Sequence, residues 1–277
     1  MRQLTRWSFA AFALLLTAAP LHAQRYSDDD DNARWLDQCR NNWNNDRDRG
    51  RACEVRTVPV RLTGRALEID GRENGGIKVR GWSGDSVLVT ARIQAWDDDD
   101  ASAASLLKQV QVTSDGRRVR AEGPSGSWHR RNWSVSYMVW VPRTFDLTLD
   151  ANNGGLAVTG VRGKLDLRTT NGGVSLDDVG GDVHARTQNG GLNVSLVGSQ
   201  WEGTGLDAET QNGGVRVSIP EKYAATLETG TVNGSMQTDF PITVQGRITR
   251  RLTLPLNGGG KTIRAMTTNG GVRLTAR

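Results

Sequence analysis

The tripeptide Asn-Gly-Gly recurs along this chain and constrains its fold more than any other feature. Complete copies, each followed by an apolar residue, begin at Asn153, Asn171, Asn189, Asn212 and Asn269. A degenerate copy begins at Asn233, and an early copy begins at Asn74. The first two intervals are 18 residues long, and Asn233 and Asn269 are 36 residues apart. A short regular period indicates one structural unit that is repeated, rather than a single converging catalytic site.

Apolar and polar residues alternate on both sides of each asparagine. The column six residues before it contains Leu147, Leu165, Val183, Leu206, Leu227 and Ile263. The column three residues after it contains Leu156, Val174, Leu192, Val215, Met236 and Val272. This period of two is typical of half-buried strands. Each unit is therefore predicted to be a strand, a corner and a second strand, all lining one core.

A column of threonines stands two residues before the asparagine, at Thr169, Thr187, Thr210, Thr231 and Thr267. We expect these β-branched residues to fit a pleated surface and to share hydroxyl hydrogen bonds between neighbouring units. At the corner we expect the glycine to have positive φ, because glycine adopts that conformation without penalty. The predicted turn residues are Asn74, Gly75, Asn153, Gly154, Asn171, Gly172, Asn189, Gly190, Asn212, Gly213, Asn233, Gly234, Asn269 and Gly270.

Two all-β architectures satisfy these columns. In a parallel β-solenoid each unit is one rung, and equivalent residues stack about 4.8 Å apart. In an antiparallel meander or sandwich each Asn-Gly would be a tight hairpin turn. We favour the solenoid, because stacking explains why the same residues recur at turn after turn.

The chain divides into three predicted regions. Residues 1–23 have the basic start, apolar run and small-residue end of a secretory signal peptide, with retention as an anchor as the alternative. Residues 24–57 form an acidic linker and a helical cap, with a short helix over Asn32 to Asn45 and a disulfide between Cys39 and Cys53. Residues 58–277 form the repeat domain, and no later segment is long and apolar enough to span a membrane.

Within the repeat domain, Leu67 to Trp82 reproduce the pattern and are predicted to be the first rung. We expect the segment that follows to separate this rung from the main stack at Asn153. Near the end, Asn257 to Gly260 is out of step with the repeat. We interpret it as the turn of an insertion whose strand is Arg247 to Pro255. The Cys-bearing segment is expected to shield the first rung.

The charge of the chain argues against nucleic acid as a partner. Two of the 35 basic residues lie in the leader, which leaves 33 against 30 acidic residues, a formal charge of +3. Basic clusters near residues 117–131 and 247–251 could meet anionic envelope polymers, but we favour a solvated surface as the explanation for them. The acidic runs Asp28 to Asp31 and Asp97 to Asp100 are expected to be flexible or exposed, since neither has the offsets of a calcium loop.

Five residues form the candidate binding surface: Trp128, Trp133, Trp201, Arg130 and Arg131. The core columns do not account for these aromatics, and packing at rung edges is the alternative role for them. The sequence contains no metal-ligand cluster and no nucleophile motif, and we expect no cofactor and no catalytic residue. Carboxylates that could serve a polysaccharide-active enzyme instead are Asp166, Asp177, Asp178 and Asp182.

With these motifs in place, the chain resembles the bacterial "putative adhesin" family of exported β-strand-repeat proteins. The resemblance covers roughly Val58 to Arg277. It rests on Gly75-Gly76-Ile77-Lys78-Val79, Val139-Trp140-Val141-Pro142 and the Thr-x-Asn-Gly-Gly units. It implies a β-helical domain at the periplasmic or outer face of the envelope, and it supplies no catalytic residues.

We therefore expect a non-catalytic binding or structural module whose partner is an envelope glycan or protein. The first alternative is a subunit of an envelope-stress or regulatory complex. The second is a β-helix enzyme that acts on polysaccharides.

Overall fold

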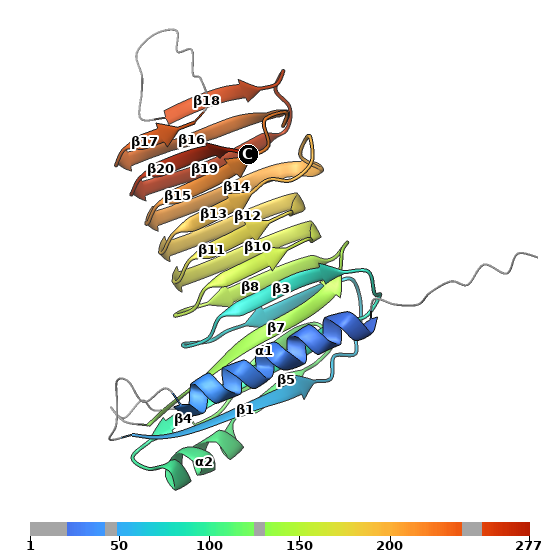
Figure 1. Cartoon of the computed structure of the whole chain (residues 1–277), viewed down its shortest axis with the longest axis vertical. Coiled ribbons are helices and arrows are strands. Elements are labelled where there is room, and N and C mark those ends of the chain that lie inside the picture. The colour runs from blue at the N-terminus through green and yellow to red at the C-terminus, as the bar shows by residue number, and fades with distance from the viewer. Residues whose placement is uncertain (1–20, 42–48, 125–130, 240–250) are drawn as a thin grey trace, which may run out of the picture.

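The computed structural model describes residues 21–41, 49–124, 131–239 and 251–277, and its strands form two sheets that run along one elongated stack (Figure 1). Sheet A contains, in spatial order, β1 (Gly50–Val58), β4 (Leu88–Asp97), β7 (Asn132–Pro142), β3 (Ile77–Trp82), β9 (Leu156–Thr159), β11 (Val174–Asp177), β13 (Leu192–Ser195), β15 (Val215–Ile219), β20 (Val272–Ala276) and β17 (Met236–Thr238). Sheet B contains β18 (Arg251–Leu256), β16 (Ala225–Asn233), β19 (Thr262–Asn269), β14 (Gly203–Asn212), β12 (Gly180–Asn189), β10 (Arg162–Asn171), β8 (Asp146–Ala151), β2 (Ala66–Asp70), β6 (Arg118–Glu122) and β5 (Gln111–Ser114).

Each repeat contributes one strand to sheet B, an Asn-Gly corner and one strand to sheet A, and we call this unit a rung. Neighbouring rungs pair in parallel and in register, so that Leu165 faces Val183 in sheet B and Val174 faces Leu192 in sheet A. Antiparallel pairing among the described residues is confined to the two ends of the stack, at β1, β4 and β7, at β5 and β6, and at β16 and β18. The all-β class is confirmed, and the antiparallel alternative does not apply to the repeats.

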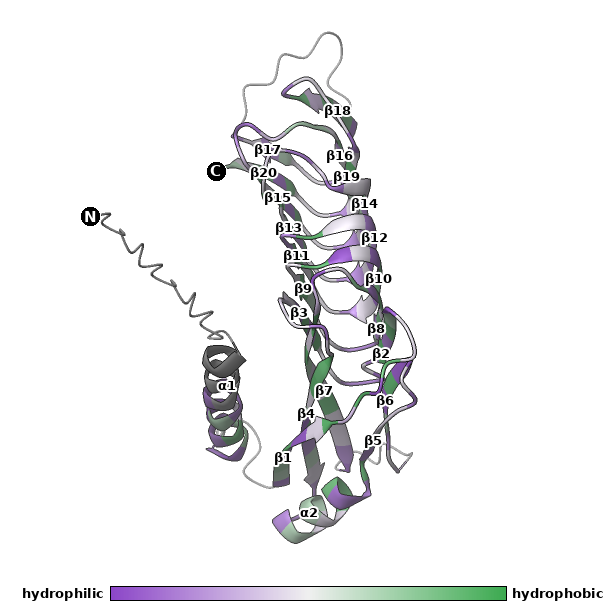
Figure 2. Cartoon of the chain, turned by 90° about the vertical axis from the view of Figure 1, so that its right-hand side faces the viewer, coloured by the Kyte–Doolittle hydropathy of each residue, from purple (hydrophilic) through white to green (hydrophobic). Residues whose placement is uncertain are grey.

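The core lies between the two sheets and follows the predicted columns. The sheet B column of Leu147, Leu165, Val183, Leu206, Ile263 and Leu227 is buried throughout. The facing sheet A column is also buried from Leu156 to Val272, and only Met236 at the edge of the stack is partly exposed. Figure 2 shows the two sheets facing each other along the length of the stack. Burial of these aliphatic side chains supplies the hydrophobic stabilisation of the fold.

The corner glycines are required by close packing, and the prediction that they have positive φ is wrong. Among the described residues, none of the first corner glycines is among those with positive φ. A Cβ on Gly172 would instead lie 2.1 Å from the carbonyl oxygen of Gly154 on the preceding rung. A clash with a backbone carbonyl oxygen, at 1.9 to 2.1 Å, recurs for the first glycine of every corner from Gly75 to Gly270; at Gly75 the oxygen belongs to Val135 on β7, and at the other corners it belongs to the first corner glycine of a neighbouring rung. Glycine is therefore needed because backbone stacks directly on backbone.

The threonine column also differs from expectation. The hydroxyls do not bond to one another; each donates to the carbonyl oxygen of the first corner glycine on the rung before it. Thr169 Oγ1 donates to Gly154 at 2.8 Å, and Thr187 Oγ1 donates to Gly172 at 2.7 Å. Because these threonines are buried, the bonds satisfy groups that would otherwise be costly to desolvate. Backbone oxygens, rather than neighbouring hydroxyls, are within reach of this column.

The corner asparagines form a continuous amide ladder on the exposed edge of the stack. Asn171 Nδ2 donates to Asn153 Oδ1, Asn189 to Asn171, and Asn212 to Asn189, each at 2.8 Å. The ladder extends to Asn74 at one end and through Asn269 to Asn233 at the other. Every amide within it both donates and accepts, so the column holds neighbouring corners in register.

The order of the strands in space departs from chain order at both ends of the stack. The rung of β2 and β3 stacks directly on β8 and β9, although Asn74 and Asn153 are 79 residues apart. The expectation that the intervening segment separates them is wrong, because that segment extends the end of the stack beyond this rung as β4 and β7 in sheet A and β6 and β5 in sheet B. At the other end, the last rung in the sequence, β19 and β20, lies between the rung of β14 and β15 and the rung of β16 and β17.

The two helices belong to the N-terminal end of the stack. α1 (Leu21–Asn41) begins earlier than the predicted helix, and the predicted disulfide between Cys39 and Cys53 is confirmed and ties α1 to β1. The helix lies against the outside of sheet A, where Asn32 Oδ1 accepts a hydrogen bond from Arg92 Nε at 2.9 Å (Figure 1). The first rung is covered by β7 and β6, and not by the Cys-bearing segment as expected.

The acidic runs lie within or beside helices, and Asp98 to Asp100 are exposed, as expected. Residues 28–31 are within α1. In the second run Asp99 is the N-cap of α2 (Asp100–Gln109), and its Oδ1 accepts from the backbone N–H of Ser102 at 2.7 Å. This hydrogen bond lowers the pKa of Asp99. Carboxylates near a helix N-terminus are favourable because they meet free N–H groups and the positive end of the helix dipole.

The predicted insertion is confirmed within the described residues. β18 is its strand and pairs with β16 in antiparallel fashion, while residues 247–250 of the predicted strand lie outside the described part of the chain. The turn from Asn257 to Gly260 has positive φ throughout, with Asn257 at 45°. None of the helices in the described part of the chain has the length and apolar character needed to cross a membrane.

Candidate functional site

Of the five residues predicted to form a binding surface, the structure describes three, and it places Trp201 apart from Trp133 and Arg131. Trp128 and Arg130 lie outside the described residues. Trp201 is 4% exposed, and its Nε1 donates to the carbonyl oxygen of Gly181 at 3.0 Å. Trp201 therefore packs inside the protein, which was the alternative to surface binding, and its ring does not reach the surface.

Trp133 and Arg131 lie together at the N-terminal end of the stack. Both line a hollow of about 440 Å³, together with Arg72, Glu73 and Asn132. Trp133 Nε1 already donates to the carbonyl oxygen of Pro124 at 3.1 Å, and Arg131 Nε lies 3.7 Å from Asp97 Oδ2. The indole N–H is thus engaged within the protein, whereas the buried Nε of Arg131 lies near a carboxylate without forming a hydrogen bond to a described residue.

The carboxylates considered for polysaccharide cleavage lie on two sheets and against basic side chains. Asp166 and Asp182 are on sheet B, whereas Asp177 is on sheet A. Asp166 pairs with Arg168 at 2.6 Å, and Asp182 Oδ1 lies 3.2 Å from His184 Nε2. Asp178 pairs with Arg162 at 2.6 Å. Glycoside hydrolysis requires two carboxyl groups that flank one bond, whereas three of these four groups already have a basic neighbour within the protein.

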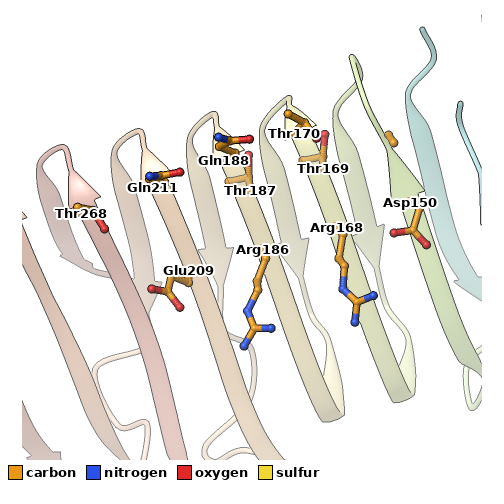
Figure 3. A pocket seen from close by; sticks show the side chains of 11 residues that line it. Asp150, Arg168, Thr169, Thr170, Arg186, Thr187, Gln188, Glu209, Gln211 and Thr268 are labelled. Atoms are coloured by element: carbon orange, nitrogen blue, oxygen red, sulfur yellow. The ribbon is translucent and has the colours of Figure 1, made fainter. Parts of the chain in front are cut away.

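An open groove on the outer face of sheet B gathers polar side chains from neighbouring rungs. It has a volume of about 590 Å³ and crosses β8, β10, β12, β14 and β19 (Figure 3). One row of lining residues consists of Asp150, Arg168, Arg186 and Glu209, and a second row near the corners consists of Thr170, Gln188, Gln211 and Thr268. We call this surface the sheet B groove. Consecutive rungs place equivalent side chains side by side, so both rows run along the stack.

The charges in the sheet B groove balance. Its lining contains two arginines and two carboxylates. Arg168 Nη2 donates to Asp166 Oδ2 at 2.6 Å, and Arg186 Nη2 lies 3.8 Å from Asp207 Oδ2. Partial burial raises the pKa of Asp150, while the charge of Arg168 acts in the opposite direction. A neutral ligand with many hydroxyls suits such a surface better than a highly charged one, because both donors and acceptors are on offer.

Sequence reasoning did not single out the groove residues as a site. They stand one and three residues before the corner asparagine, at the outward positions between the buried columns. The signal for them was the polar half of the alternation. It identified exposed positions without showing which of the two faces carries the larger polar groove.

The described residues contain no group of three His, Cys, Asp or Glu side chains placed to hold a metal ion. The side chains that line the sheet B groove offer hydrogen bonding and charge pairing. Cofactor or metal binding has no observation to support it in this part of the chain.

The chain is similar to known proteins over most of its length. Residues 73–275 match the Toastrack DUF4097 family, a span that contains every corner from Asn74 to Asn269. A solved structure of a "putative cell adhesion protein" from Clostridium sporogenes is 10% identical, covers 82% of this chain and 100% of its own, and has a TM-score of 0.45. A "putative adhesin" from Bacteroides fragilis is 13% identical, covers 82% and 97%, and has a TM-score of 0.38. A "putative lipid binding protein" from Parabacteroides distasonis is 10% identical, covers 81% and 96%, and has a TM-score of 0.29. No curated protein matches the chain.

Proposed function

The chain belongs to the Toastrack DUF4097 family, in agreement with the resemblance seen in its sequence, and from this premise we propose that it is an exported β-solenoid that acts as a non-catalytic binding module. Its ligand is a linear envelope glycan, and its binding face is the sheet B groove. The observation that carries the proposal is the pair of polar rows that continue across neighbouring rungs.

The repeat of the fold suits a ligand that is itself a repeat. Parallel strands are about 4.8 Å apart, so each rung presents a similar polar group one step further along the groove. Gln188 and Gln211 are exposed and occupy equivalent places on adjacent rungs. An amide both donates and accepts hydrogen bonds, which matches the hydroxyl groups of a sugar chain.

Export is part of the proposal and is supported by two features of the N-terminal region. Residues 1–23 have the composition of a secretory signal peptide. The disulfide that ties α1 to β1 is of the kind that persists outside the cytosol. We place the mature protein in the periplasm or on the outer cell surface.

The test is a glycan array and a pull-down from envelope extract with residues 24–277 as the probe. We expect a linear glycan to bind, and the Gln188→Ala/Gln211→Ala variant to lose about tenfold or more in affinity. The matched control is Gln111→Ala/Gln200→Ala, which removes two exposed amides away from the groove and should bind normally.

Three results would overturn the proposal. Capture of a specific protein with no glycan binding would favour a subunit of an envelope regulatory complex. Equal binding by both double variants would remove the sheet B groove from the mechanism. Turnover of a bound glycan would show that the module is an enzyme.

A further inference from the structure

A second groove lies on the outer face of sheet A and differs from the sheet B groove in charge. Its volume is about 490 Å³, and its polar side chains are Asn193, Arg216, Arg273, Gln237 and Ser235. The two arginines are the charged side chains in this lining, and no carboxylate accompanies them. We call this surface the sheet A groove. Its lining has a formal charge of +2, whereas the charges in the lining of the sheet B groove sum to zero.

The two arginines are direct partners across neighbouring strands. Arg216 on β15 is in register with Arg273 on β20, although 57 residues separate them in the sequence. Asn193 precedes Arg216 in the same column, and Gln237 follows Arg273. The inserted rung of β19 and β20 creates this pair, because in chain order Gln237 would lie between the arginines.

This pair is costly in the free protein. Like charges directly opposite each other on adjacent strands repel. Arg216 Nη1 donates to Asn193 Oδ1 at 3.4 Å, and the described lining of the groove contains no carboxylate that could pair with either guanidinium. Both side chains are exposed. A bound anion would relieve the repulsion and fill the unused donors.

We propose that the sheet A groove is a separate binding site for an acidic linear glycan, with Arg216 and Arg273 as its specificity-determining residues. A guanidinium pairs with a planar carboxylate through two parallel hydrogen bonds. Asn193, Gln237 and Ser235 flank the arginines and meet the neutral hydroxyl groups of adjacent sugar units. The ligand class is a polysaccharide that bears carboxylates at regular intervals.

The same groove is poorly suited to other anionic partners. Single-stranded nucleic acid binds on aromatic platforms, and the groove lining contains no aromatic residue. A lipid requires an apolar slot for its acyl chains, yet the apolar side chains of the lining, Val215 and Val272, are each 2% exposed. The inference does not rest on the proposed function of the sheet B groove, which lies on the opposite sheet.

The probe is a short oligomer of galacturonic acid, compared with the same oligomer after methyl esterification. Binding is measured by titration calorimetry with residues 24–277 at physiological salt. We expect the acid form to bind and the ester to bind about tenfold or more weakly, because the ester cannot pair with guanidinium. Arg216→Gln/Arg273→Gln should weaken binding of the acid form by a similar factor.

Arg118→Gln/Arg120→Gln is the control, since it removes two exposed charges on β6 at the far end of the molecule. It should bind like the original protein. Thermal unfolding of the Arg216→Gln/Arg273→Gln variant verifies that it is folded.

Equal weakening by both double variants would show binding to overall charge and would overturn the site. So would equal binding of acid and ester, or no binding of the acid form. Binding of single-stranded DNA or phosphatidylglycerol vesicles in place of the glycan would overturn the ligand class. Loss of neutral-glycan binding in the sheet B groove would leave all these outcomes unchanged, so the two proposals can fail separately.

Discussion

The two glycines of each Asn-Gly-Gly corner face different surroundings. A Cβ on the first, such as Gly190, would lie 2.1 Å from the Gly172 carbonyl oxygen of the preceding rung. That same oxygen accepts the hydroxyl of Thr187. A Cβ on the second glycine, Gly191, would have its nearest neighbour 3.6 Å away, at an ordinary contact distance. At this corner only the first glycine is needed for the stacking.

We predict that Gly190→Ala lowers the free energy of unfolding by about 3 kcal/mol or more, because backbone must move away from backbone. Gly191→Ala is the matched control and should change it by less than about 1 kcal/mol, since alanine also restricts the unfolded chain. Urea unfolding followed by circular dichroism measures both. Similar losses in the two variants would refute the stacking explanation of the corner.

The positions of these glycines were readable from the repeat, but the reason for them was not. Conformational freedom and lack of space both select glycine. The deciding contact joins Gly190 to Gly172, which lie 18 residues apart in sequence and touch only after the rungs have stacked. The threonine bonds escaped sequence analysis for the same reason, because their acceptors belong to the preceding rung.

At the scale of elements, the N-terminal end of the stack depends on specific side-chain links. Arg56 on β1 donates to the carbonyl oxygen of Val110 at 2.5 Å and of Leu107 at 3.3 Å, both at the C-terminal end of α2. A cation in this position complements the negative end of the helix dipole. Glu54 holds Arg56 through two further bonds, and this pairing lowers the pKa of Glu54.

α1 depends more heavily on its disulfide. Its other described links to the sheet include the Arg92 contacts with Asn32 and with the ring of Trp35, whose centroid lies 5.7 Å from the guanidinium carbon. We predict that Cys39→Ser/Cys53→Ser releases α1 while the rungs remain folded, since closing a loop of this size contributes about 3 kcal/mol. Hydrogen exchange should become fast in residues 30–41 and stay slow in β10 to β15. Fast exchange in those strands would contradict this division.

The second acidic run shows the limit of local sequence reasoning at this scale. Four consecutive aspartates suggest mutual repulsion and an exposed segment, and Asp98 to Asp100 are exposed. The sequence did not reveal that Asp99 is the N-cap of α2 and has a specific partner in the Ser102 backbone N–H. The helix N-terminus offsets part of the repulsion.

At the scale of the whole molecule, the sequence predicts which residues make up each rung. It does not predict the order in which the rungs stack. Val215, Val272 and Met236 occupy the same column, so any of these rungs fits beside any other. The order follows from the insertion instead. β18 pairs with the outer edge of β16, and β19 can therefore pair only with the inner edge, between β14 and β16.

The candidate sites depend on that order. Outward polar positions were visible as one half of the alternation, yet the pairing of Arg216 with Arg273 requires the displaced rung. The tryptophans were selected because the core columns did not explain them. Trp201 proved to be part of the core, because a large ring outside the strand columns can be buried without following the period of two.

The most direct test of the stack is the position of Arg273 relative to Arg216 and Gln237. In the order β15, β20, β17, Arg216 and Arg273 are one strand spacing apart, about 4.8 Å, and Arg216 and Gln237 are two spacings apart, about 10 Å. Disulfides form only when the two Cα atoms are within about 7 Å. We predict that Arg216→Cys/Arg273→Cys forms a disulfide on mild oxidation, seen by mass spectrometry of unreduced peptides, and that Arg216→Cys/Gln237→Cys does not. A disulfide in the second variant and none in the first would show that the rungs stack in chain order and would contradict the account.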